Sequence, residues 1–536
     1  MSEIMTGAQA AIAQLVTEGV EVILSIPGEH NIALCDAVLD YPGLQFITGR
    51  HEQGIAFMAN GYARASNRIA VVMTITGPGV INGLTPLADA FLDTVPMVMI
   101  ATQAPLDKLG KGTFHELKDQ SKMIASVAKW SAVVHSAEEI PQAIRDAFTQ
   151  AWQGRPGPTV IEIPMDVQYQ KAAVEIYPSA RSEAVFPADD ILDKAAQALG
   201  NSENPLLFIG RGAALSGCSQ ELLTLMGRCQ LPCYTTSLAK GIVPEDHPLN
   251  ISWGGARHGL IGEYLPRADT VLVVGSSLDE AEIERLNLTF SGRLIQIDTC
   301  PEVIGRKHPV YIPLIGDAKV VLEKLIERIG KPKRKRQRLT GSKIKDYQLN
   351  QLDKLKNKLA WQYMDAIQQS LDRDAIITND ASWANDWAIS FLQRYQVNTF
   401  QITRMAAALG FAFPAAVGAK LAYPNRQALA LVGDGGFLFT IPSLATAVQH
   451  HLNPVTVIFN DSSYSSIGRL QNHQFHRQIG VSLRNPDFLK LAEAFGAAAA
   501  RVQPPEELYE QLVIAWEREI PTVIEVILDQ AMDYLV

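Results

Sequence analysis

The sequence predicts an α/β protein in which three domains are each built on a doubly wound parallel sheet. A chain of 536 residues is too long for one hydrophobic core. Short apolar runs that read as buried strands alternate with helical patterns, as parallel sheets covered by helices require. Two polar stretches, residues 169–190 and 331–338, interrupt this alternation and indicate linkers between the domains.

The first domain is expected over residues 1–170. Helical patterns at residues 8–18 and 52–65 lie around its strand-like runs, which end in turn residues. The runs are "GVEVILSIPG" (19–28), "RIAVVMTITGPG" (68–79) and "VPMVMIAT" (95–102), and the unit ends near "GPTVIEIPMDV" (157–167).

The second domain is expected over residues 188–330 and the third over residues 358–536. The strands expected in the second are "NPLLFIGRGA" (204–213), "ADTVLVVGSSL" (268–278) and "GRLIQIDTCP" (292–301), and those in the third are "DAIITND", "QALALVGDG", "NPVTVIFND" and "PTVIEVIL". The six cations of "KPKRKRQR" (331–338) lie between folded units of an acidic protein and indicate a solvated linker. The first and third units share a strand–helix rhythm, which suggests an old duplication.

The composition of the chain argues against several classes of function. The net charge of −9 implies no general affinity for nucleic acid or for anionic lipid. The first 14 residues lack the basic start of a signal peptide, and the longest uncharged apolar stretch, about 406–419, is too short to span a bilayer. Five cysteines without a second pair or a histidine at zinc spacing make neither a disulfide framework nor a zinc site. We therefore expect a cytoplasmic enzyme with no nucleic-acid or membrane partner.

Two strand-like runs in the third unit each end in a small acidic cluster. The run "ALALV" is followed by Gly433-Asp434-Gly435-Gly436 and then by a helical pattern. In open α/β sheets ligands bind beyond the carboxyl ends of the strands. Glycines allow close backbone approach, and the start of the next helix offers N–H groups to a phosphate.

The second run, "VTVIF", delivers Asn460-Asp461. Asp434 and Asp461 would supply carboxylate oxygens to Mg²⁺ or Ca²⁺ and Ser463 a carbonyl oxygen, which leaves room for phosphate oxygens and water. Either cluster alone could be an ordinary strand-ending turn. Together, with this spacing, they predict a hard cation that holds a phosphate.

This two-part pattern resembles the signature of the thiamine diphosphate (ThDP) enzyme family, in which a GDG turn and a following Asn-Asn-type pair hold the metal and the diphosphate. The resemblance implies ThDP and Mg²⁺ as cofactors, bound through Gly433–Gly436, Asp461, Ser463 and Tyr464. The family's second Asn is Asp461 here, which keeps the oxygen ligand but adds a negative charge. The family's Glu-Leu after GDG is Ser443-Leu444, and its Tyr-Gly is Tyr464-Ser465.

The family activates ThDP with a buried Glu that hydrogen-bonds to N1′ of the aminopyrimidine. The segment "GRHEQGIAFMANGYARAS" (49–66) is similar to the family's segment, which makes Glu52 the candidate. Apolar neighbours suit a carboxyl that both gives and takes a proton. The alternative is a Glu that only interacts with the positive end of a helix dipole.

Two further segments resemble cofactor-binding parts of the family. "TGPGVINGL" (76–84) is similar to the glycine-rich turn of the pyrimidine-binding domain and places Gly77 and Pro78 at the cofactor. "MAAALGFAFPAAVGAKLA" (405–422) resembles the stretch that cradles the bent cofactor, with Ala407 in the cradle and Leu409 as the wedge between the two rings. Leu409 could instead be an ordinary core residue.

The resemblance spans nearly the whole chain: a pyrimidine-binding domain, a central α/β domain and a diphosphate-binding domain. The phrases "RPGPTVIEIPMDV" (155–167) and "GFAFPAAVGAKLA" (410–422) look most like the acetolactate synthase branch. In that branch the activating Glu, here Glu52, reaches the ThDP of a neighbouring subunit. The resemblance therefore implies a homodimer as the minimum active unit, and homotetramers are common in the branch.

Two departures from the synthase branch favour a decarboxylase. "PGEHN" (27–31) has Glu29 where the branch has a second glycine and where simple decarboxylases place an acid that helps to protonate the enamine. "GTFHELKDQ" (112–120) has His115 where the synthase has Gln. A Glu–His pair near the reacting carbon would favour protonation over carboligation. Alternatively, Glu29 lies in a surface turn and His115 caps a helix.

In the diphosphate region, Ser382-Trp383-Ala384 replaces the synthase's Gly-Gln-His. Ser382 and Asn385 could donate to phosphate oxygens, while Trp383 either shapes a pocket or packs in the core. The resemblance argues against tightly bound FAD, although one FAD-lining loop is partly kept. "SLDEA" (277–281) lacks both arginines of the synthase's FAD contact "RFDDR", whereas "GGARHGL" (254–260) keeps part of another FAD-lining loop.

The leading hypothesis is a ThDP- and Mg²⁺-dependent, non-oxidative decarboxylase that converts a 2-oxo acid through an enamine. Acetolactate synthase or a related carboligase is the alternative, and a non-catalytic ThDP-fold binding protein is the remote one. Acidic residues near the pocket, namely Glu29, Glu116 and Asp119, favour a guanidino- or amino-substituted oxo acid. His473 and His476 follow the metal loop, where related enzymes fold a lid, and could also form a solvated helix face.

Overall fold

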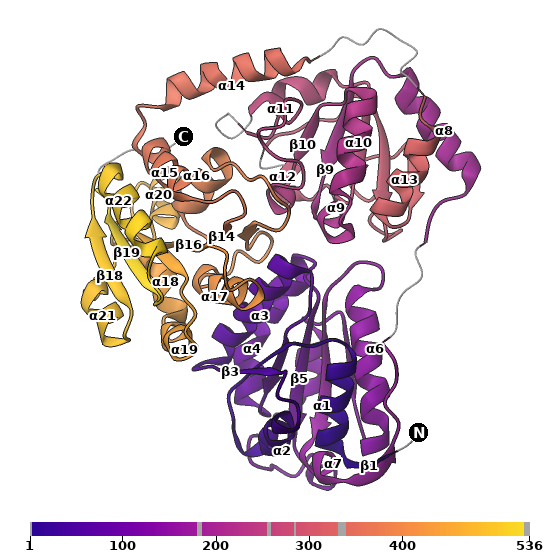
Figure 1. Ribbon diagram of the computed structural model, residues 1–536, viewed down its shortest axis with the longest axis vertical. Helices are drawn as coiled ribbons and strands as arrows, with labels where there is room; N and C mark the ends of the chain where they lie inside the picture. The colour runs from indigo at the N-terminus through magenta and orange to yellow at the C-terminus, as the bar shows by residue number, and fades with distance from the viewer. Residues whose placement is uncertain (1–2, 180–184, 254–258, 284–285, 331–338, 530–536) are drawn as a thin grey trace.

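A computed structural model describes residues 3–179, 185–253, 259–283, 286–330 and 339–529. Within these ranges the chain forms three parallel sheets of six, five and six strands, each covered by helices, as the sequence predicts. In Figure 1 the N-terminal domain (indigo to violet) lies below, the middle domain (magenta) above it, and the C-terminal domain (orange to yellow) beside both. The expected basic linker, 331–338, lies outside the described residues.

The N-terminal sheet has the strand order β3-β2-β4-β5-β7-β6, and all of its pairs are parallel. Its central strands are buried on both faces, which explains why they read as continuous apolar runs. The strands are β2 (Val22–Ser25), β3 (Gln45–Thr48), β4 (Val71–Thr74), β5 (Met97–Gln103), β6 (Trp130–Val133) and β7 (Pro158–Pro164). The helices are α1 (Gly7–Thr17), α2 (Ile32–Ala37), α3 (Glu52–Ser66), α4 (Pro78–Leu92), α5 (Gln120–Ala125), α6 (Ile140–Trp152) and α7 (Met165–Tyr169).

The stretch predicted as the first linker begins with a strand instead. β8 (Lys171–Val174) pairs antiparallel with β1 (Glu3–Thr6), and Ala172 and Val174 are buried. Exposed and buried residues alternate along β8, which is the pattern of a strand with one solvent-facing side. Strand pairing therefore ties the start of this stretch to the N-terminal domain.

The middle domain has the strand order β10-β9-β11-β12-β13, again with parallel pairing. The strands are β9 (Pro205–Ile209), β10 (Cys233–Thr235), β11 (Thr270–Val274), β12 (Arg293–Asp298) and β13 (Ile312–Ile315). The helices are α8 (Asp189–Asn201), α9 (Arg211–Ser216), α10 (Ser219–Cys229), α11 (Gly259–Tyr264), α12 (Glu280–Ile283) and α13 (Ala318–Arg328), and α14 (Gly341–Leu355) then leads to the third domain.

The C-terminal sheet has the strand order β15-β14-β16-β17-β19-β18. The strands are β14 (Ile376–Asn379), β15 (Phe400–Ile402), β16 (Ala428–Gly433), β17 (Val455–Asn460), β18 (Ala498–Val502) and β19 (Thr522–Ile527). The helices are α15 (Leu359–Ser370), α16 (Trp383–Phe391), α17 (Ala412–Ala422), α18 (Asp434–Thr440), α19 (Ser443–Gln449), α20 (Ser465–Phe475), α21 (Phe488–Ala494) and α22 (Pro505–Trp516).

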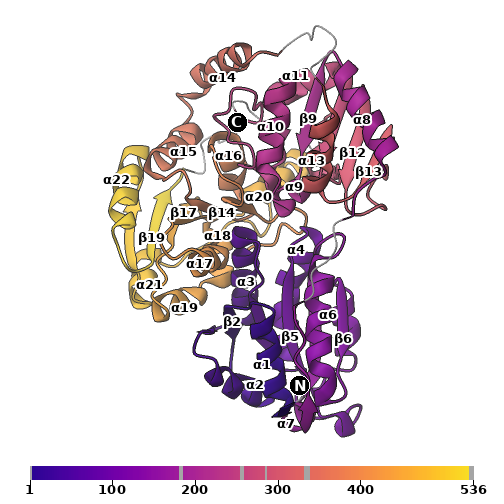
Figure 2. The ribbon, with the colours of Figure 1, turned by 45° about the vertical axis from the view of Figure 1, so that its right-hand side comes forward.

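The N- and C-terminal domains meet where α3 lies along α17, as both ribbon views show (Figures 1 and 2). Glycines allow this close approach: a Cβ on Gly61 would lie 2.4 Å from the Ala415 Cα, and one on Gly418 would lie 1.9 Å from the Met58 carbonyl oxygen. Since no side chain could fit at those distances, the helix pair depends on both glycines.

Buried charges reinforce this contact between the domains. Arg64, on α3, donates from Nη2 to Asp89 Oδ2 and to Asp93 Oδ2, each at 3.0 Å, and from Nη1 to the Ile402 carbonyl oxygen at 2.9 Å. Asp93 also accepts the backbone N–H of Met405 at 3.0 Å. The start of the 403–410 loop in the C-terminal domain is therefore fixed to α4 of the N-terminal domain.

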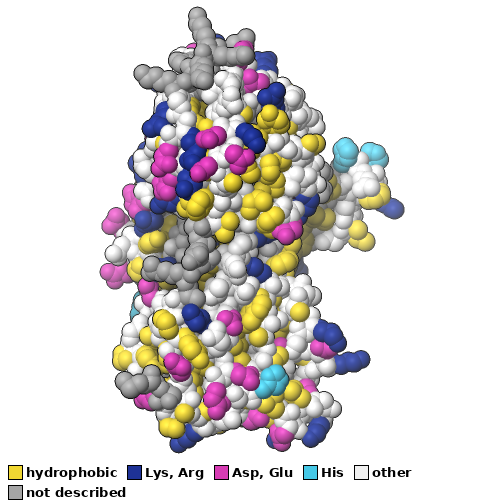
Figure 3. Space-filling view, turned by 90° about the vertical axis from the view of Figure 1, so that its right-hand side faces the viewer, with side chains coloured by type: hydrophobic (Ala, Val, Ile, Leu, Met, Phe, Trp, Pro, Cys, Tyr) yellow, Lys and Arg dark blue, Asp and Glu magenta, His cyan; other side chains and the backbone are white. Residues whose placement is uncertain are grey.

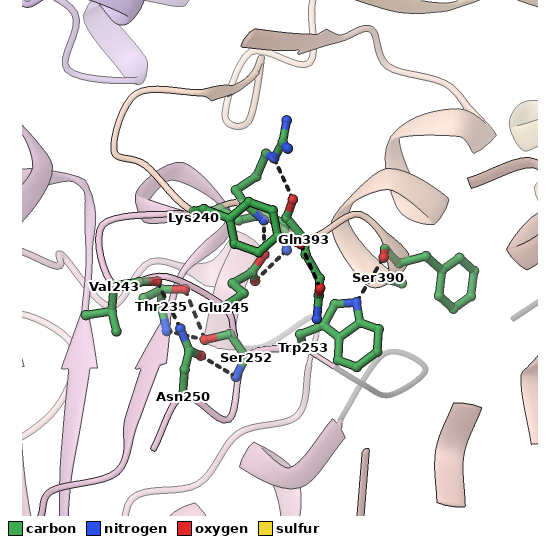
Figure 4. Close-up of polar contacts among 12 residues, drawn as sticks. Thr235, Lys240, Val243, Glu245, Asn250, Ser252, Trp253, Ser390 and Gln393 are labelled. Atoms are coloured by element: carbon green, nitrogen blue, oxygen red, sulfur yellow. Dashed lines mark hydrogen bonds and ion pairs between the residues drawn. The ribbon is translucent and has the colours of Figure 1, made fainter. Parts of the chain in front are cut away.

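The middle and C-terminal domains meet at a second buried ion pair (Figure 4). Lys240 Nζ lies 2.6 Å from Glu245 Oε1, and Glu245 Oε2 accepts the Arg394 backbone N–H at 2.7 Å. Trp253 Nε1 donates to the Phe391 carbonyl oxygen at 2.9 Å. These contacts seat the middle domain against the end of α16.

No helix in the described part of the chain is long and apolar enough to cross a bilayer.

Candidate functional site

Glu52 is the first residue of α3 and follows β3 at the carboxyl edge of the N-terminal sheet. It is only 8% exposed, and its Oε2 accepts a hydrogen bond of 2.9 Å from Asn82 Nδ2 on α4. A Cβ on Gly79 would lie 3.3 Å from Glu52 Oε1, so the glycine makes room for the carboxylate. Asn82 was not predicted as a site residue, although it lies within "TGPGVINGL" (76–84), because nothing in that segment links it to Glu52.

Gly77 and Pro78 lie between β4 and α4 at the same edge. Gly77 has φ +71°, and a Cβ there would lie 2.2 Å from the His115 carbonyl oxygen, so this turn requires glycine. Its N–H donates to Gln120 Oε1 at 2.9 Å. Pro78 is the first residue of α4, where its missing N–H costs no hydrogen bond.

Asp434 and Asp461 lie at the carboxyl ends of the paired strands β16 and β17. Both are buried, and Asp434 is the first residue of α18, so the helix begins within the glycine-rich turn itself. Burial, with the nearby charge of Asp461, raises the pKa of Asp434 to about 6, and burial also raises the pKa of Asp461. Two buried carboxylates that interact in this way favour a cation between them.

The loop after β17 surrounds Asp461. The Ser463 N–H donates to Asp461 Oδ1 at 3.1 Å, and the Ser465 hydroxyl donates to Oδ2. The ring of Tyr464 stands over Gly435, where a Cβ would lie 2.4 Å from Tyr464 Cε1. In the described residues no three Asp, Glu, His or Cys side chains gather as metal ligands, so carbonyl, phosphate or water oxygens would have to complete a two-carboxylate site.

Asn485 is a member of this site that the sequence analysis missed. Its Nδ2 donates to Asp434 Oδ2 at 2.6 Å and to Asn460 Oδ1 at 3.1 Å. It therefore orients the first carboxylate. Asn485 comes from a loop 51 residues after Asp434, so no local pattern could have identified it.

Asp380, which directly follows β14, is a third residue that was not predicted. Its carboxyl accepts the Gly410 N–H at 2.9 Å, and a Cβ on Gly436 would lie 3.1 Å from Asp380 Oδ2. Burial raises the pKa of Asp380 to about 7. The predicted cradle residues Ala407 and Leu409 precede Gly410 in this loop; Ala407 is exposed with φ +47°, and Leu409 is half-buried. The position of Asp380 directly after a strand-like run was the sequence signal that could have identified it as a site residue.

Ser382 and Asn385 lie at the start of α16. Ser382 Oγ and Asn385 Oδ1 are buried and have no hydrogen-bond partner among the described residues. A Cβ on Gly433 would lie 3.3 Å from the Ser382 Cβ, which places Ser382 beside the carboxylate edge. Unpartnered polar atoms, a helix start and two buried carboxylates together fit a phosphate held through a divalent cation.

Trp383 stacks under the guanidinium of Arg469, 4.1 Å from the ring centre. It is half-buried and connects α16 to α20, next to the metal loop. His473 and His476, near the end of α20, are exposed.

Glu29 and His115 follow β2 and β5 at the carboxyl edge that carries Glu52. Glu29 begins a 3-10 turn, η1 (Glu29–Asn31), and is exposed, whereas its neighbour His30 is buried. His115 is half-buried and has φ +65°. The other two acids of this region have local partners. Glu116 accepts the backbone N–H groups of residues 110 and 113, and Asp119 begins α5 and pairs with Lys122.

A separate cavity of about 320 Å³ lies where the three domains meet. Gly210, Gly212 and Gly275 line it at the carboxyl ends of β9 and β11, together with Ser277 and Asp279 of the segment compared above with a FAD contact. Arg211 stands between the first two glycines, and burial lowers its pKa to about 9. Most of the other FAD-related segment, residues 254–258, lies outside the described residues.

Family comparisons cover all three domains. The family model described as "Thiamine pyrophosphate enzyme, N-terminal TPP binding domain" matches residues 5–123. The model of the central domain matches residues 192–325, and that of the C-terminal TPP binding domain matches residues 380–526.

Curated relatives align over almost the full length. A probable acetolactate synthase large subunit of Methanocaldococcus jannaschii is 32% identical over 98% of this chain and 92% of its own. A probable 2-ketoarginine decarboxylase of Pseudomonas aeruginosa is 33% identical over 97% of this chain and 94% of its own. The acetolactate synthase large subunit of Corynebacterium glutamicum is 30% identical over 98% of this chain and 87% of its own.

Proposed function

Because the chain belongs to the thiamine pyrophosphate enzyme family, we propose that it is a ThDP- and Mg²⁺-dependent, non-oxidative 2-oxo acid decarboxylase. In this reaction a 2-oxo acid anion and one proton give an aldehyde and CO₂. When bound, ThDP would supply a nucleophilic carbon for the oxo group of the substrate and a cationic ring that takes up the electron pair released as CO₂ leaves. The protein must hold the cofactor, exclude water and manage two proton transfers.

The residues of the C-terminal domain would hold the cofactor. Asp434, Asp461 and the Ser463 carbonyl would bind Mg²⁺, and Asn485 keeps the first carboxylate oriented through its 2.6 Å hydrogen bond. The unpartnered oxygen of Ser382 supports a role as a phosphate ligand.

The N-terminal domain would carry the activating carboxyl. Glu52 would be the residue that exchanges a proton with the aminopyrimidine, and Asn82 fixes the Oε2 atom of Glu52 by its hydrogen bond. Gly79 leaves the space that this carboxyl needs. The wedge role of Leu409 agrees with its half-buried position in a loop held by Asp380.

A single observation favours decarboxylation: His115, whose Nδ1 atom has no hydrogen-bond partner among the residues that the structure describes, follows β5 at the edge that carries Glu52. A nearby acid would deliver a proton to the carbon that has lost CO₂ and release the aldehyde. The relative named as a 2-ketoarginine decarboxylase supports the same reaction type.

Acetolactate synthase is the second candidate, because relatives with that name align over 98% of the chain. Purified enzyme with ThDP and Mg²⁺ should be assayed on a panel of 2-oxo acids, with aldehydes and acetolactate- or acetoin-type products measured separately. Aldehyde as the main product supports the decarboxylase. Acetolactate as the main product from pyruvate would refute it in favour of the second candidate.

For the substrate we propose a 2-oxo acid with a cationic, guanidino or amino side chain. The printed name of one relative supports this class, and exposed Glu29 is an acid able to meet a cation. Glu116 and Asp119 are engaged in local contacts, which leaves Glu29 as the acid that matters. A Glu29→Gln variant should raise KM for guanidino substrates far more than KM for pyruvate.

We further propose a homodimer, and a tetramer built from two such dimers. Large apolar side chains are exposed on and beside α4, α18 and α20, the helices that carry or flank the site; they include Ile81, Phe91, Phe439, Ile467 and Leu470. Figure 3 shows hydrophobic patches on both lobes of one face of the molecule. A second copy would cover such patches. Analytical ultracentrifugation tests the assembly state, and a monomer with full activity would contradict it.

A further inference from the structure

The 403–410 loop, which carries the proposed cofactor contacts Ala407 and Leu409, contains a strained residue. Ala407 has φ +47°, a left-handed conformation that is unfavourable for a residue with a Cβ and that persists only where the surroundings impose it. The end of the loop is fixed, because the Gly410 N–H donates to Asp380 at 2.9 Å. The position of Leu409 therefore depends on the contacts that hold the start of the loop.

The N-terminal domain holds the start of the loop from one side. Asp93 accepts the backbone N–H of Arg404 at 2.8 Å. The Thr403 hydroxyl donates to Asp89 and accepts the backbone N–H of Ala408 at 3.1 Å. These contacts fix the backbone of the loop, and they leave the Arg404 side chain to extend toward the middle domain.

The middle domain holds the loop from the other side through a carboxyl group. Glu282, on α12, has its Oε2 atom 3.5 Å from Arg404 Nη2, and the two side chains are only 8% and 9% exposed. Glu282 Oε1 accepts the Tyr234 hydroxyl at 2.5 Å, and the Glu282 backbone N–H donates to Asp279 at 3.1 Å. The carboxyl group is thus fixed within its own domain at the place where it meets Arg404.

Open space adjoins this ion pair. Glu282 and Arg404 both line the cavity of about 320 Å³ where the three domains meet. The same two residues line a second cavity, of about 100 Å³, together with Tyr234. Because the pair forms part of the wall between two cavities, the ion pair rather than close packing sets the distance between the loop and the middle domain. Removal of either partner would leave a buried charge without its counter-charge and would favour a displaced loop.

We infer that Glu282 is a positioning residue: through its ion pair with Arg404 it holds the 403–410 loop, and hence Leu409, in the conformation that receives ThDP. The inference rests on the proposed function. It gives a part in cofactor binding to the middle domain, which contributes no residue to the proposed cofactor site. Glu282 lies in a different domain from every residue of that site, so it would act through Arg404.

Hydrogen–deuterium exchange tests the loop in protein without cofactor. The backbone N–H groups of Arg404, Met405 and Ala408 are hydrogen-bonded, so they exchange slowly while the loop is held. In Glu282→Gln, which removes the charge that pairs with Arg404, we expect peptides covering residues 403–410 to exchange about 5- to 50-fold faster. Wild-type exchange of these peptides in Glu282→Gln would overturn the inference.

Binding of ThDP in the presence of Mg²⁺ tests whether Glu282 acts through Arg404. Isothermal titration calorimetry on wild type, Glu282→Gln, Arg404→Gln and the double variant forms a double-mutant cycle. Each single substitution should weaken ThDP binding about 5- to 50-fold. The double variant should bind less than about twofold more weakly than Arg404→Gln alone, because the shared contact is already lost. Additive losses would show that Glu282 does not act through Arg404.

Glu245→Gln is the matched control. Glu245 is also a buried carboxyl of the middle domain that pairs with a cation, Lys240, but it contacts the C-terminal domain at the Arg394 backbone N–H rather than at the loop. Its substitution should lower the free energy of unfolding and leave ThDP affinity and exchange of the loop within about twofold of wild type. Effects on both as large as those of Glu282→Gln would mean a general loosening of the domains and would overturn the specific role.

A milder variant keeps the test decisive if Glu282→Gln does not fold. Tyr234→Phe removes only the hydroxyl that donates to Glu282, and it should weaken ThDP binding and accelerate exchange of the loop by about two- to fivefold. Wild-type values for both quantities in Tyr234→Phe and in Arg404→Gln would overturn the inference.

The outcomes distinguish this inference from the proposed function. If wild-type protein binds no ThDP in the presence of Mg²⁺, the proposed function fails, and exchange in the cofactor-free protein alone decides whether Glu282 holds the loop. If wild-type protein binds ThDP and the variants at Glu282 and Arg404 match it in both measurements, the positioning role is wrong while the proposed function stands.

Discussion

The first and third domains are built on the same sheet. In each, the strands numbered along the chain lie in the order second, first, third, fourth, sixth, fifth. In each, the third strand runs into a glycine and a helix that begins at once: β4 into Gly77 and α4, and β16 into Gly433 and α18. The identical order supports the duplication suggested by the strand rhythm.

What differs is the chemistry carried at equivalent strand ends. Glu52 follows the second strand of the first domain, and Leu409 follows the second strand of the third. The fourth strands are followed by His115 and Asp461. The sheets thus place two similar sets of loops, and the loop residues make one domain suited to proton transfer and the other to binding a cation. The shared strand order determines where the loops lie, and the residues in the loops determine which chemistry each domain can carry out.

The largest effect on activity is expected from a substitution of Asp434, the proposed cation ligand in the third domain. Asp434→Asn should lower activity about 1000-fold or more and abolish detectable Mg²⁺-dependent ThDP binding, because the amide removes one of the two negative charges that would hold the cation. Isothermal titration calorimetry measures the binding directly. Asp353→Asn, at an exposed carboxylate paired with Lys356, is the control. Unchanged binding in Asp434→Asn would remove the basis of the metal site.

Substitution of Glu52, the proposed proton-transfer residue of the first domain, should lower kcat and leave ThDP affinity nearly unchanged. Glu52→Gln keeps the size and the hydrogen-bonding capacity of the side chain but cannot exchange a proton, so kcat should fall about 100- to 10,000-fold. ThDP affinity, followed by fluorescence quenching, should change less than about threefold. Wild-type turnover in this variant would contradict the proposed role of Glu52 in activating the cofactor.

The contact between the two domains can be broken without touching either site. Gly418→Val places a side chain where the Met58 carbonyl oxygen approaches α17. We expect the free energy of unfolding to fall by about 1–3 kcal/mol or more, because the helices must separate. Denaturant unfolding measures the change, and Gly227→Val, where a Cβ meets nothing within 4 Å, is the control for helix propensity. Equal losses in both variants would show that the helix contact is unimportant.

The smallest expected effect is a pH dependence of Mg²⁺ affinity. The pKa of Asp434 is about 6 in the folded protein and 3.8 ordinarily, so protons compete with the metal below pH 6. Affinity should weaken about tenfold per pH unit from pH 6 downward and stay nearly constant above pH 7. In metal-free protein the raised pKa has a second consequence: this carboxyl lowers the free energy of unfolding as pH rises from 4 through 6. Titrations at five pH values test the first point, and a flat profile would contradict it.

Local pattern was enough to predict the parts of the site that follow strands directly. Gly433, Asp434 and Asp461 end apolar runs, so their place at one sheet edge followed from parallel topology. The linker prediction was wrong for residues 171–174, because pairing of β8 with β1 depends on a partner about 170 residues away.

The sequence by itself determined the three-sheet architecture, the glycine-lined turns and the two carboxylates, because periodicity and strand-end chemistry are local properties. Only the tertiary structure decided that Asn82 orients Glu52, that Asn485 orients Asp434, and that His30 faces His115. Those contacts join segments that are adjacent only after helices and sheets pack. Side chains that orient or pair with a functional group are recruited by proximity in space, and proximity in space leaves no regular spacing in a sequence.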